Sequence, residues 1–240
     1  MSLIIWTPAE LSSKAQNLSV KVWRMVEAQH LVSTSKIVNT KVEQELLEDI
    51  LEEYKPPIPK EATDLHYLLF SPFRYEPRQP TGSRFRAVSE PGVFYAAETV
   101  RTAAAEVGYW RWRFLQDTSG LERLQPCAFT SFKVPIKASC IDLREPPFAD
   151  DSSYWLHPTD YSATQALGRV ARDASIGAII YQSVRDPQKH FCSAILTPQA
   201  FAAKKPDSAY QTWSLTISTE EAIWMRQGEE SFSFQTCQWE

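Results

Sequence analysis

The residues best suited to chemistry lie between Gly82 and Arg111, where arginines, aromatic residues and a carboxylate follow one another closely. Arg84 follows a Gly-Ser turn signal. Tyr95 lies in a short apolar run that is typical of a buried strand. Glu106 lies in the helical pattern that comes next, at the edge of its apolar stripe. Glu106 is therefore either a solvated flank of that helix or a carboxylate held at the mouth of a pocket.

Arginines and aromatic residues also alternate just before this stretch, at Arg74-Tyr75. Guanidinium groups can bind the pyrophosphate of a dinucleotide in pairs of hydrogen bonds, and aromatic rings can stack on its planar bases. Such residues indicate a dinucleotide pocket. The plainer interpretation is a set of exposed loop charges that pair with neighbouring acidic residues.

Ser183 comes just after the apolar run of residues 177–181, at the kind of position where functional loop residues gather. The plainer interpretation is a turn serine. Nothing marks it as the nucleophile of a hydrolase, because the G-x-S-x-G pattern is missing from the sequence.

The sequence contains neither the G-x-G-x-x-G pattern nor a Walker loop, so a nucleotide would be held by side chains. Cleavage of the nicotinamide–ribose bond of NAD+ fits these residues better than hydride transfer, because its oxocarbenium-like transition state needs a nearby carboxylate. The four cysteines (Cys127, Cys140, Cys192 and Cys237) and the scattered histidines show no metal-ligand spacing, so we expect no metal.

The order of these motifs resembles the RES domain, a family named for an Arg, a Glu and a Ser that supplies toxins of bacterial toxin–antitoxin pairs. The resemblance covers residues 65 to 200 and includes the Arg-rich turn, Tyr95, Glu106 and the later run Tyr181-Gln182-Ser183-Val184-Arg185. The Gly-Gly-Arg-Phe turn common in the family is Gly-Ser-Arg-Phe here.

The resemblance implies a mixed sheet related to the ADP-ribosyltransferase fold, with NAD+ as the substrate. It implies that Glu106, Arg74 and Ser183 are catalytic and that Arg74, Tyr75, Arg84, Tyr95 and Ser183 bind NAD+. Arg24, in Trp23-Arg24, is a second candidate for the family's leading arginine. We prefer Arg74 because it precedes the Arg84 turn by a short loop.

Composition limits the class of protein and the kinds of partner it can bind. The chain has 240 residues, of which 43% are hydrophobic and 22% charged, as expected for a globular protein with a sizeable core. Its formal net charge of −4 disfavours a general binder of nucleic acids or anionic membranes. We find no signal peptide or membrane-spanning run and expect a cytoplasmic protein with reduced thiols.

The pattern of elements favours an α+β fold with an N-terminal helical extension (1–60) and a RES-type NAD-binding domain (61–240). The extension contains a strong amphipathic helix over Lys41 to Tyr54, which prolines end. We expect further helices over 100–114 and from Thr159 or Asp160 to Arg172, a strand or short helix over 65–70, and strands over 93–97, 127–134, 138–143, 177–181, 191–196, 213–217 and 232–236.

The leading hypothesis is a RES toxin that cleaves NAD+ and passes ADP-ribose to phosphate or water. Transfer of ADP-ribose to a protein target is the first alternative, and a non-catalytic module that binds a nucleotide or partner is the second. The resemblance implies an Xre-like antitoxin as partner, which would supply any DNA binding. We also expect a homo-oligomer, for which the helix over Lys41 to Tyr54 is a possible surface.

Overall fold

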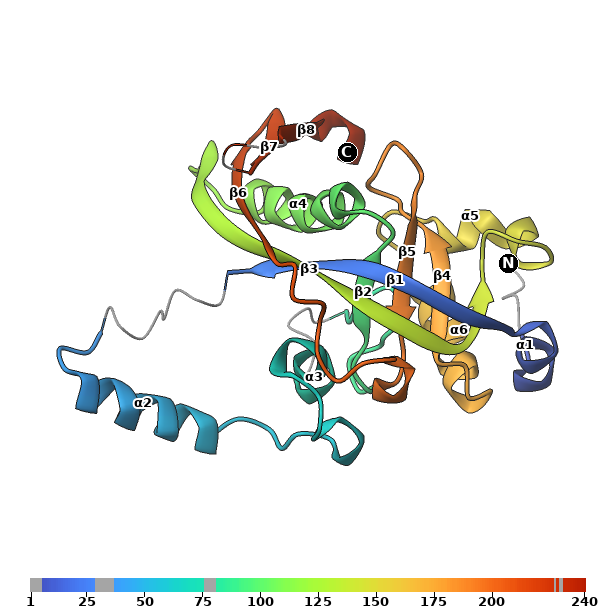
Figure 1. Ribbon diagram of the computed structural model, residues 1–240. Helices are drawn as coiled ribbons and strands as arrows, with labels where there is room; N and C mark the ends of the chain where they lie inside the picture. Colours follow the sequence, from blue (N-terminus) through green and yellow to red (C-terminus); the bar gives the residue numbers. More distant parts are fainter. Residues whose placement is uncertain (1–5, 29–36, 76–80, 227, 229–230) are drawn as a thin grey trace.

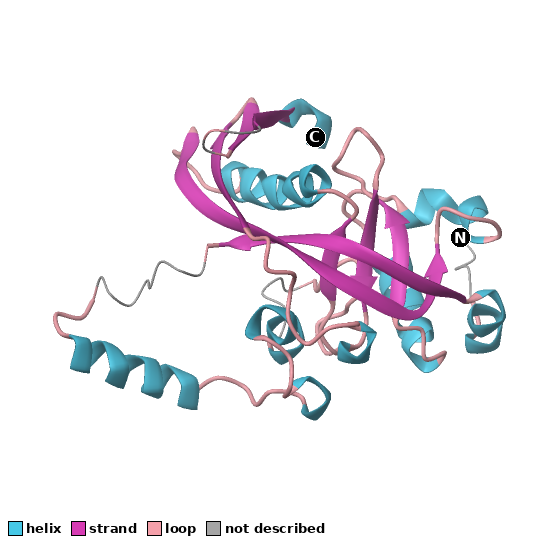
Figure 2. Ribbon diagram, viewed as in Figure 1, coloured by secondary structure: helices cyan, strands magenta, loops and turns pink. Residues whose placement is uncertain are grey.

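The computed structural model describes residues 6–28, 37–75, 81–226, 228 and 231–240. It confirms an α+β protein in which helices pack on an eight-stranded mixed sheet (Figures 1 and 2). The strands are β1 Gln16–Glu27, β2 Phe94–Ala97, β3 Arg123–Asp142, β4 Ala178–Gln182, β5 Phe191–Ile195, β6 Gln211–Ser218, β7 Glu221–Met225 and β8 Ser231–Gln235. The α-helices are α1 Pro8–Lys14, α2 Lys41–Glu53, α3 Tyr67–Arg74, α4 Val100–Gln116, α5 Ser152–Trp155 and α6 Ser162–Asp173.

The sheet closes on itself at one end. Its order is β1-β2-β5-β4-β3-β6-β7-β8, and β1 also pairs with β3, so the first five strands form a closed circuit of pairings. Only β3 and β4 are parallel among these pairings of the described strands. Strands β6, β7 and β8 then extend the sheet as a meander from β3.

The description of residues 1–60 as a helical extension needs correction, because β1 lies within the sheet. It pairs with β3 along its whole length, from Gln16 opposite Cys140 to Glu27 opposite Phe129. Its burial alternates from Leu18 to Val22, as expected for a strand with one face on the core. Residues 16–27 are therefore part of the fold that carries the site.

A second correction concerns the strands predicted over 127–134 and 138–143, which form one continuous strand that includes Pro135. Pro135 lies inside this long strand, β3, opposite Lys21 of β1. The Pro135 carbonyl accepts a hydrogen bond from Ala202 N, so this residue's polar backbone groups point away from β1. The proline consequently removes no hydrogen bond from the β1–β3 pairing.

The stretch from residue 93 to 116 forms the strand and helix that the sequence predicts. Thr99 is the N-cap of α4, and its Oγ1 accepts a hydrogen bond from Thr102 N at 3.0 Å. The strand β2 lies between β1 and β5, which places the start of α4 beside the closed part of the sheet.

The buried face of α4 matches only in part the apolar stripe of residues 100, 103, 104, 107, 110 and 114 that spacings of three and four predict. Trp110 and Phe114 are 42% and 56% exposed, whereas Gly108 packs so closely that an added Cβ would lie 3.0 Å from the Trp239 ring. Aromatic residues at the C-terminal end of the protein therefore decide which face is covered. The buried residues of α4 are Thr102, Ala103, Ala104, Ala105, Gly108, Tyr109, Trp112 and Leu115.

Helix α2 forms where the sequence predicts but buries none of its residues. Val42 and Leu46 are 74% and 59% exposed, and Figure 1 shows the helix set apart from the sheet. An ion pair of 2.8 Å joins Glu52, near its end, to Arg74 at the end of α3. None of the described helices is long and apolar enough to cross a membrane.

Candidate functional site

A cavity of about 410 Å³ opens where the closed part of the sheet meets α4. Strands β1, β2, β4 and β5, helix α4 and the turn at 82–84 all contribute to its wall. The lining residues are Trp23, Arg24, Met25, Gly82, Ser83, Arg84, Tyr95, Ala96, Ala97, Ala103, Glu106, Val107, Trp110, Tyr161, Tyr181 and Cys192. Three of the predicted site residues, Arg84, Tyr95 and Glu106, are among them.

Glu106 provides the negative charge of this cavity. Its Oε1 accepts a hydrogen bond of 2.6 Å from the Ser183 hydroxyl. The Cys192 thiol lies 3.6 Å from the same oxygen. No hydrogen bond reaches Oε2 from the described residues, so that oxygen can interact with a bound molecule.

Ser183 is not on the cavity wall and reaches the site through Glu106. Its Oγ accepts hydrogen bonds from Arg185 N at 3.2 Å and from Asp186 N at 3.1 Å, so it caps a tight turn. With two N–H groups donating to Oγ, the hydroxyl hydrogen is directed to Glu106. Ser183 therefore caps a turn and also contacts Glu106.

The same turn is tied to α4 at a second point. Thr102 Oγ1 donates a 2.7 Å hydrogen bond to the fully buried carboxylate of Asp186. Thr102 and Glu106 are four residues apart and share one face of α4. Two hydrogen bonds therefore tie this turn to α4, and one of them reaches the Glu106 carboxylate.

Arg84 is nearly buried, at 8% exposure, and faces the cavity. Its Nη1 donates to the carbonyls of Trp155 at 2.9 Å and His157 at 3.0 Å. Its guanidinium lies 4.7 Å from the centre of the Tyr161 ring. Arg84 forms no ion pair with a carboxylate among the described residues, so its charge is available to an anion.

Arg24 contributes a second cationic group from β1. Its Nη1 donates to the Tyr95 carbonyl at 2.6 Å, and the guanidinium lies 4.4 Å from the centre of the Phe94 ring. Burial lowers the pKa of Arg24 to about 10, which leaves it positively charged at neutral pH. Its Nε has no hydrogen-bond partner among the described residues.

Arg74 and Tyr75, which were expected to bind NAD+, do not line the cavity, whereas Arg24 does. The Arg74 guanidinium binds Glu52 at 2.8 Å and the Pro56 carbonyl, so it fastens the end of α3 to the segment after α2. Tyr75 is 39% exposed and packs beside Arg74. The arginine that the fold brings to Arg84 and Glu106 is the one on β1.

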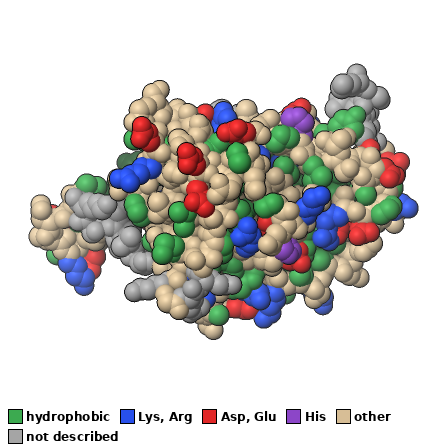
Figure 3. All heavy atoms as spheres, turned by 90° about the horizontal axis from the view of Figure 1, so that it is seen from above, with side chains coloured by type: hydrophobic (Ala, Val, Ile, Leu, Met, Phe, Trp, Pro, Cys, Tyr) green, Lys and Arg blue, Asp and Glu red, His purple; other side chains and the backbone are tan. Residues whose placement is uncertain are grey.

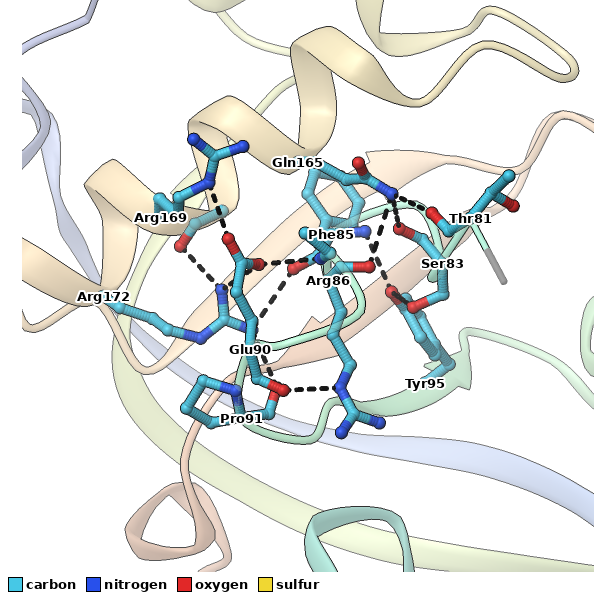
Figure 4. Close-up of polar contacts among 12 residues, drawn as sticks. Thr81, Ser83, Phe85, Arg86, Glu90, Pro91, Tyr95, Gln165, Arg169 and Arg172 are labelled. Carbon is cyan, nitrogen blue, oxygen red and sulfur yellow. Dashed lines mark hydrogen bonds and ion pairs between the residues drawn. The ribbon is translucent and has the colours of Figure 1, made fainter. Parts of the chain in front are cut away.

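Tyr95 lines the cavity, and its hydroxyl contacts the turn at residues 83–85 (Figure 4). The hydroxyl oxygen accepts from Phe85 N at 2.9 Å and lies 2.9 Å from Ser83 Oγ. Burial raises the pKa of Tyr95, so the phenol stays neutral. It therefore supports the turn that carries Arg84.

Several lining residues were missed by the sequence reasoning. Tyr161 comes just before α6 and Trp110 lies on α4, and neither is near Arg84 in sequence. Tyr181 belongs to the Tyr-Gln-Ser-Val-Arg run that carries the family resemblance, and this run is the one signal in the sequence that points to it. Burial raises the pKa of Tyr181 and of Cys192 well above their ordinary values, so both are neutral.

Surface charge, the state of the cysteines and the possible metal ligands complete the description of the site's surroundings. On the face seen in Figure 3, basic and acidic side chains are interspersed. All four cysteines are free thiols. Across residues 6–28, 37–75, 81–226, 228 and 231–240, no three His, Cys, Asp or Glu side chains cluster in a way that could hold a metal ion.

Comparison with known proteins identifies the family of this chain. A search of curated protein sequences finds no match. One protein in the crystal structure of the M. tuberculosis MbcT–MbcA toxin–antitoxin complex is similar in structure, with a TM-score of 0.48 and 9% identity over 97% of this chain and 93% of that chain. The RES domain model matches residues 58–218, about two thirds of the sequence and including Arg84, Glu106 and Ser183, so the protein belongs to the RES domain family.

Proposed function

We propose that this protein is a toxin that binds NAD+ in the cavity and breaks the nicotinamide–ribose bond. One observation carries the proposal: a carboxylate and two arginines face the same cavity, and neither arginine forms an ion pair with a described carboxylate. Such a site suits a molecule that carries a pyrophosphate and develops positive charge in the transition state.

Each group has a separate task in this proposal. Arg24 and Arg84 bind the pyrophosphate oxygens and neutralise their charge. Glu106 stabilises the oxocarbenium-like ribose, and the Ser183 hydroxyl keeps the carboxylate oriented. Aromatic rings around Arg84 offer surfaces on which a planar ring can stack.

The bond that breaks joins the anomeric carbon of the ribose to the nicotinamide nitrogen. Its electron pair leaves with the nicotinamide, which becomes neutral, so no proton donor is required for departure. An oxygen of phosphate or water then bonds to the anomeric carbon, and water releases one proton to solvent. The ADP-ribosyl group ends on phosphate or as free ADP-ribose, and NAD+ is consumed.

A direct experiment is to incubate the purified protein with NAD+ and to measure free nicotinamide, with and without phosphate. Release of nicotinamide supports the proposal, and a requirement for phosphate identifies the acceptor. Binding of NAD+ without any release would instead favour a non-catalytic nucleotide-binding module.

Transfer of ADP-ribose to a protein is the second candidate, and one observation favours it. Trp110 lines the cavity yet is 42% exposed, and Phe114, one turn further along α4, is 56% exposed. Exposed aromatic residues beside a pocket are typical of a surface that contacts another protein. Radiolabelled ADP-ribose that appears on proteins of a cell extract would support this candidate.

A further inference from the structure

We infer that α6 is the platform that positions Arg84, and that Gln165 is the positioning residue through which it acts. The inference rests on the proposed function only for its substrate measurements. Its structural basis is the set of contacts in Figure 4, where side chains of α6 meet the backbone of the turn at residues 81–91. We call this turn the Arg84 loop.

Gln165 faces three carbonyls of the Arg84 loop. Its Nε2 lies 2.8 Å from Thr81 O, 3.1 Å from Ser83 O and 3.4 Å from Arg86 O. These carbonyls lie on both sides of Arg84. A single amide nitrogen carries two hydrogens, so it can donate hydrogen bonds at once to carbonyls that precede and follow Arg84.

Two more residues on the same face of α6 continue this contact. Gly168 approaches so closely that an added Cβ would lie 2.7 Å from Phe85 O. Arg172 donates from Nη2 to Phe85 O at 3.2 Å and to Pro91 O at 3.3 Å. Residues 165, 168 and 172 recur at spacings of three and four, which makes one stripe along the helix.

Glu90 fastens the far end of the Arg84 loop. Its carboxylate accepts from Arg169 Nε at 2.6 Å and from Ala87 N at 2.8 Å, and its backbone carbonyl accepts from Arg86 Nε at 2.8 Å. Arg169 also belongs to α6. The loop is therefore held to this helix along most of its length.

The side chain of Arg84 is held by the segment that leads into the same helix. Its two carbonyl partners belong to Trp155 and His157, and Tyr161 packs on its guanidinium. The backbone and the side chain of Arg84 thus have one common support. Removing the hydrogen bonds of Gln165 should let the loop move relative to that support. We expect this movement to weaken anion binding by Arg84 and to leave Glu106 in place.

The test compares Gln165→Leu with two other variants. Leucine keeps the bulk of the side chain but has no donor, whereas Gln165→Lys restores N–H donors and should rescue. Asp173→Asn, at the exposed end of α6, is the matched control. The first measurement is limited trypsin digestion in the absence of any ligand, with mass spectrometry to identify the cleaved bonds.

Trypsin should cut after Arg84 and Arg86 about tenfold faster in Gln165→Leu, as expected for the loss of a hydrogen bond that holds a turn. Cleavage after Arg101 in α4 is the internal reference. Equal acceleration at all three sites would mean general destabilisation and would overturn the inference. Unchanged cleavage at Arg84 and Arg86 would overturn it as well.

The second measurement is the turnover of NAD+. We expect KM to rise about tenfold in Gln165→Leu, kcat to change by less than about threefold, and Gln165→Lys to recover most of the loss. A fall in kcat with unchanged KM would contradict the assignment. If the wild-type protein does not turn over NAD+, the proposed function fails, and the digestion pattern still decides whether α6 positions the loop.

Discussion

Glu106 is the residue on which the proposed chemistry depends most. We expect Glu106→Gln to keep the fold and to lower NAD+ turnover by about 10²–10³-fold, because it removes the charge that stabilises the transition state. The Ser183 hydroxyl can still donate to the amide oxygen, so the melting temperature should change little. Glu122→Gln, at an exposed position, is the control. Turnover at the wild-type rate would remove Glu106 from the mechanism.

The two candidate arginines can be separated by a matched pair of variants. Arg24→Ala should weaken NAD+ binding by about tenfold or more, because it removes a charged group from the cavity wall. Arg74→Ala should leave the dissociation constant unchanged, because its guanidinium is committed to Glu52 and Pro56. Calorimetric titration with NAD+ measures both. The opposite result would restore Arg74 as the arginine that binds substrate.

Ser183 caps a turn and also donates a hydrogen bond to Glu106, and one substitution tests both contacts. Ser183→Ala leaves the Arg185 and Asp186 N–H groups without the acceptor that caps their turn and releases Glu106. We expect a loss of about 1–3 kcal/mol in the free energy of unfolding together with slower turnover. Denaturant titration and a nicotinamide-release assay measure these separately. Full stability and full activity would show that neither hydrogen bond matters.

Among the elements, α2 and α3 differ sharply in the burial of their apolar side chains. Leu46→Gln on α2 should change the free energy of unfolding by less than about 0.5 kcal/mol, because that side chain is 59% exposed. Leu69→Ala on α3 should cost about 2–5 kcal/mol, because Leu69 is fully buried against the sheet. Urea denaturation compares them. A large loss from Leu46→Gln would mean that α2 is covered in solution.

At the scale of the whole molecule, the proposed toxin activity raises the question of how the cell that makes the protein would inhibit it. We propose an Xre-like antitoxin that places an acidic side chain or its own terminal carboxylate in the cavity, where Arg24 and Arg84 would attract it. Purified antitoxin should then compete with NAD+, and Arg84→Glu should weaken the complex. Simultaneous binding with no loss of affinity for either would rule out this model.

Self-association is a separate proposal at the same scale. The exposed apolar side of α2 is a candidate homodimer surface, although its six acidic residues would meet those of a second copy. Light scattering coupled to gel filtration gives the mass directly. If α2 joins two copies, the wild-type protein is a dimer and Leu46→Gln shifts it toward the monomer.

Much of the local structure follows from sequence alone. The runs 93–97, 177–181 and 191–196 contain enough aromatic and branched residues to predict strands, and β2, β4 and β5 confirm them. Thr99 predicts the start of α4, and prolines 56 and 57 predict the end of α2. These features depend on residues within a few positions of each other, so the sequence carries them completely.

The composition of the site depended on tertiary structure. Arg24 lies 60 residues before Arg84 in the sequence, and it reaches the cavity because β1 pairs with both β2 and β3. Arg74 is much closer in sequence, but its helix directs it to Glu52. Likewise, the buried face of α4 is the one against which Trp239, near the C-terminus, packs. Pairing between distant segments sets these contacts, and no local pattern of residues encodes it.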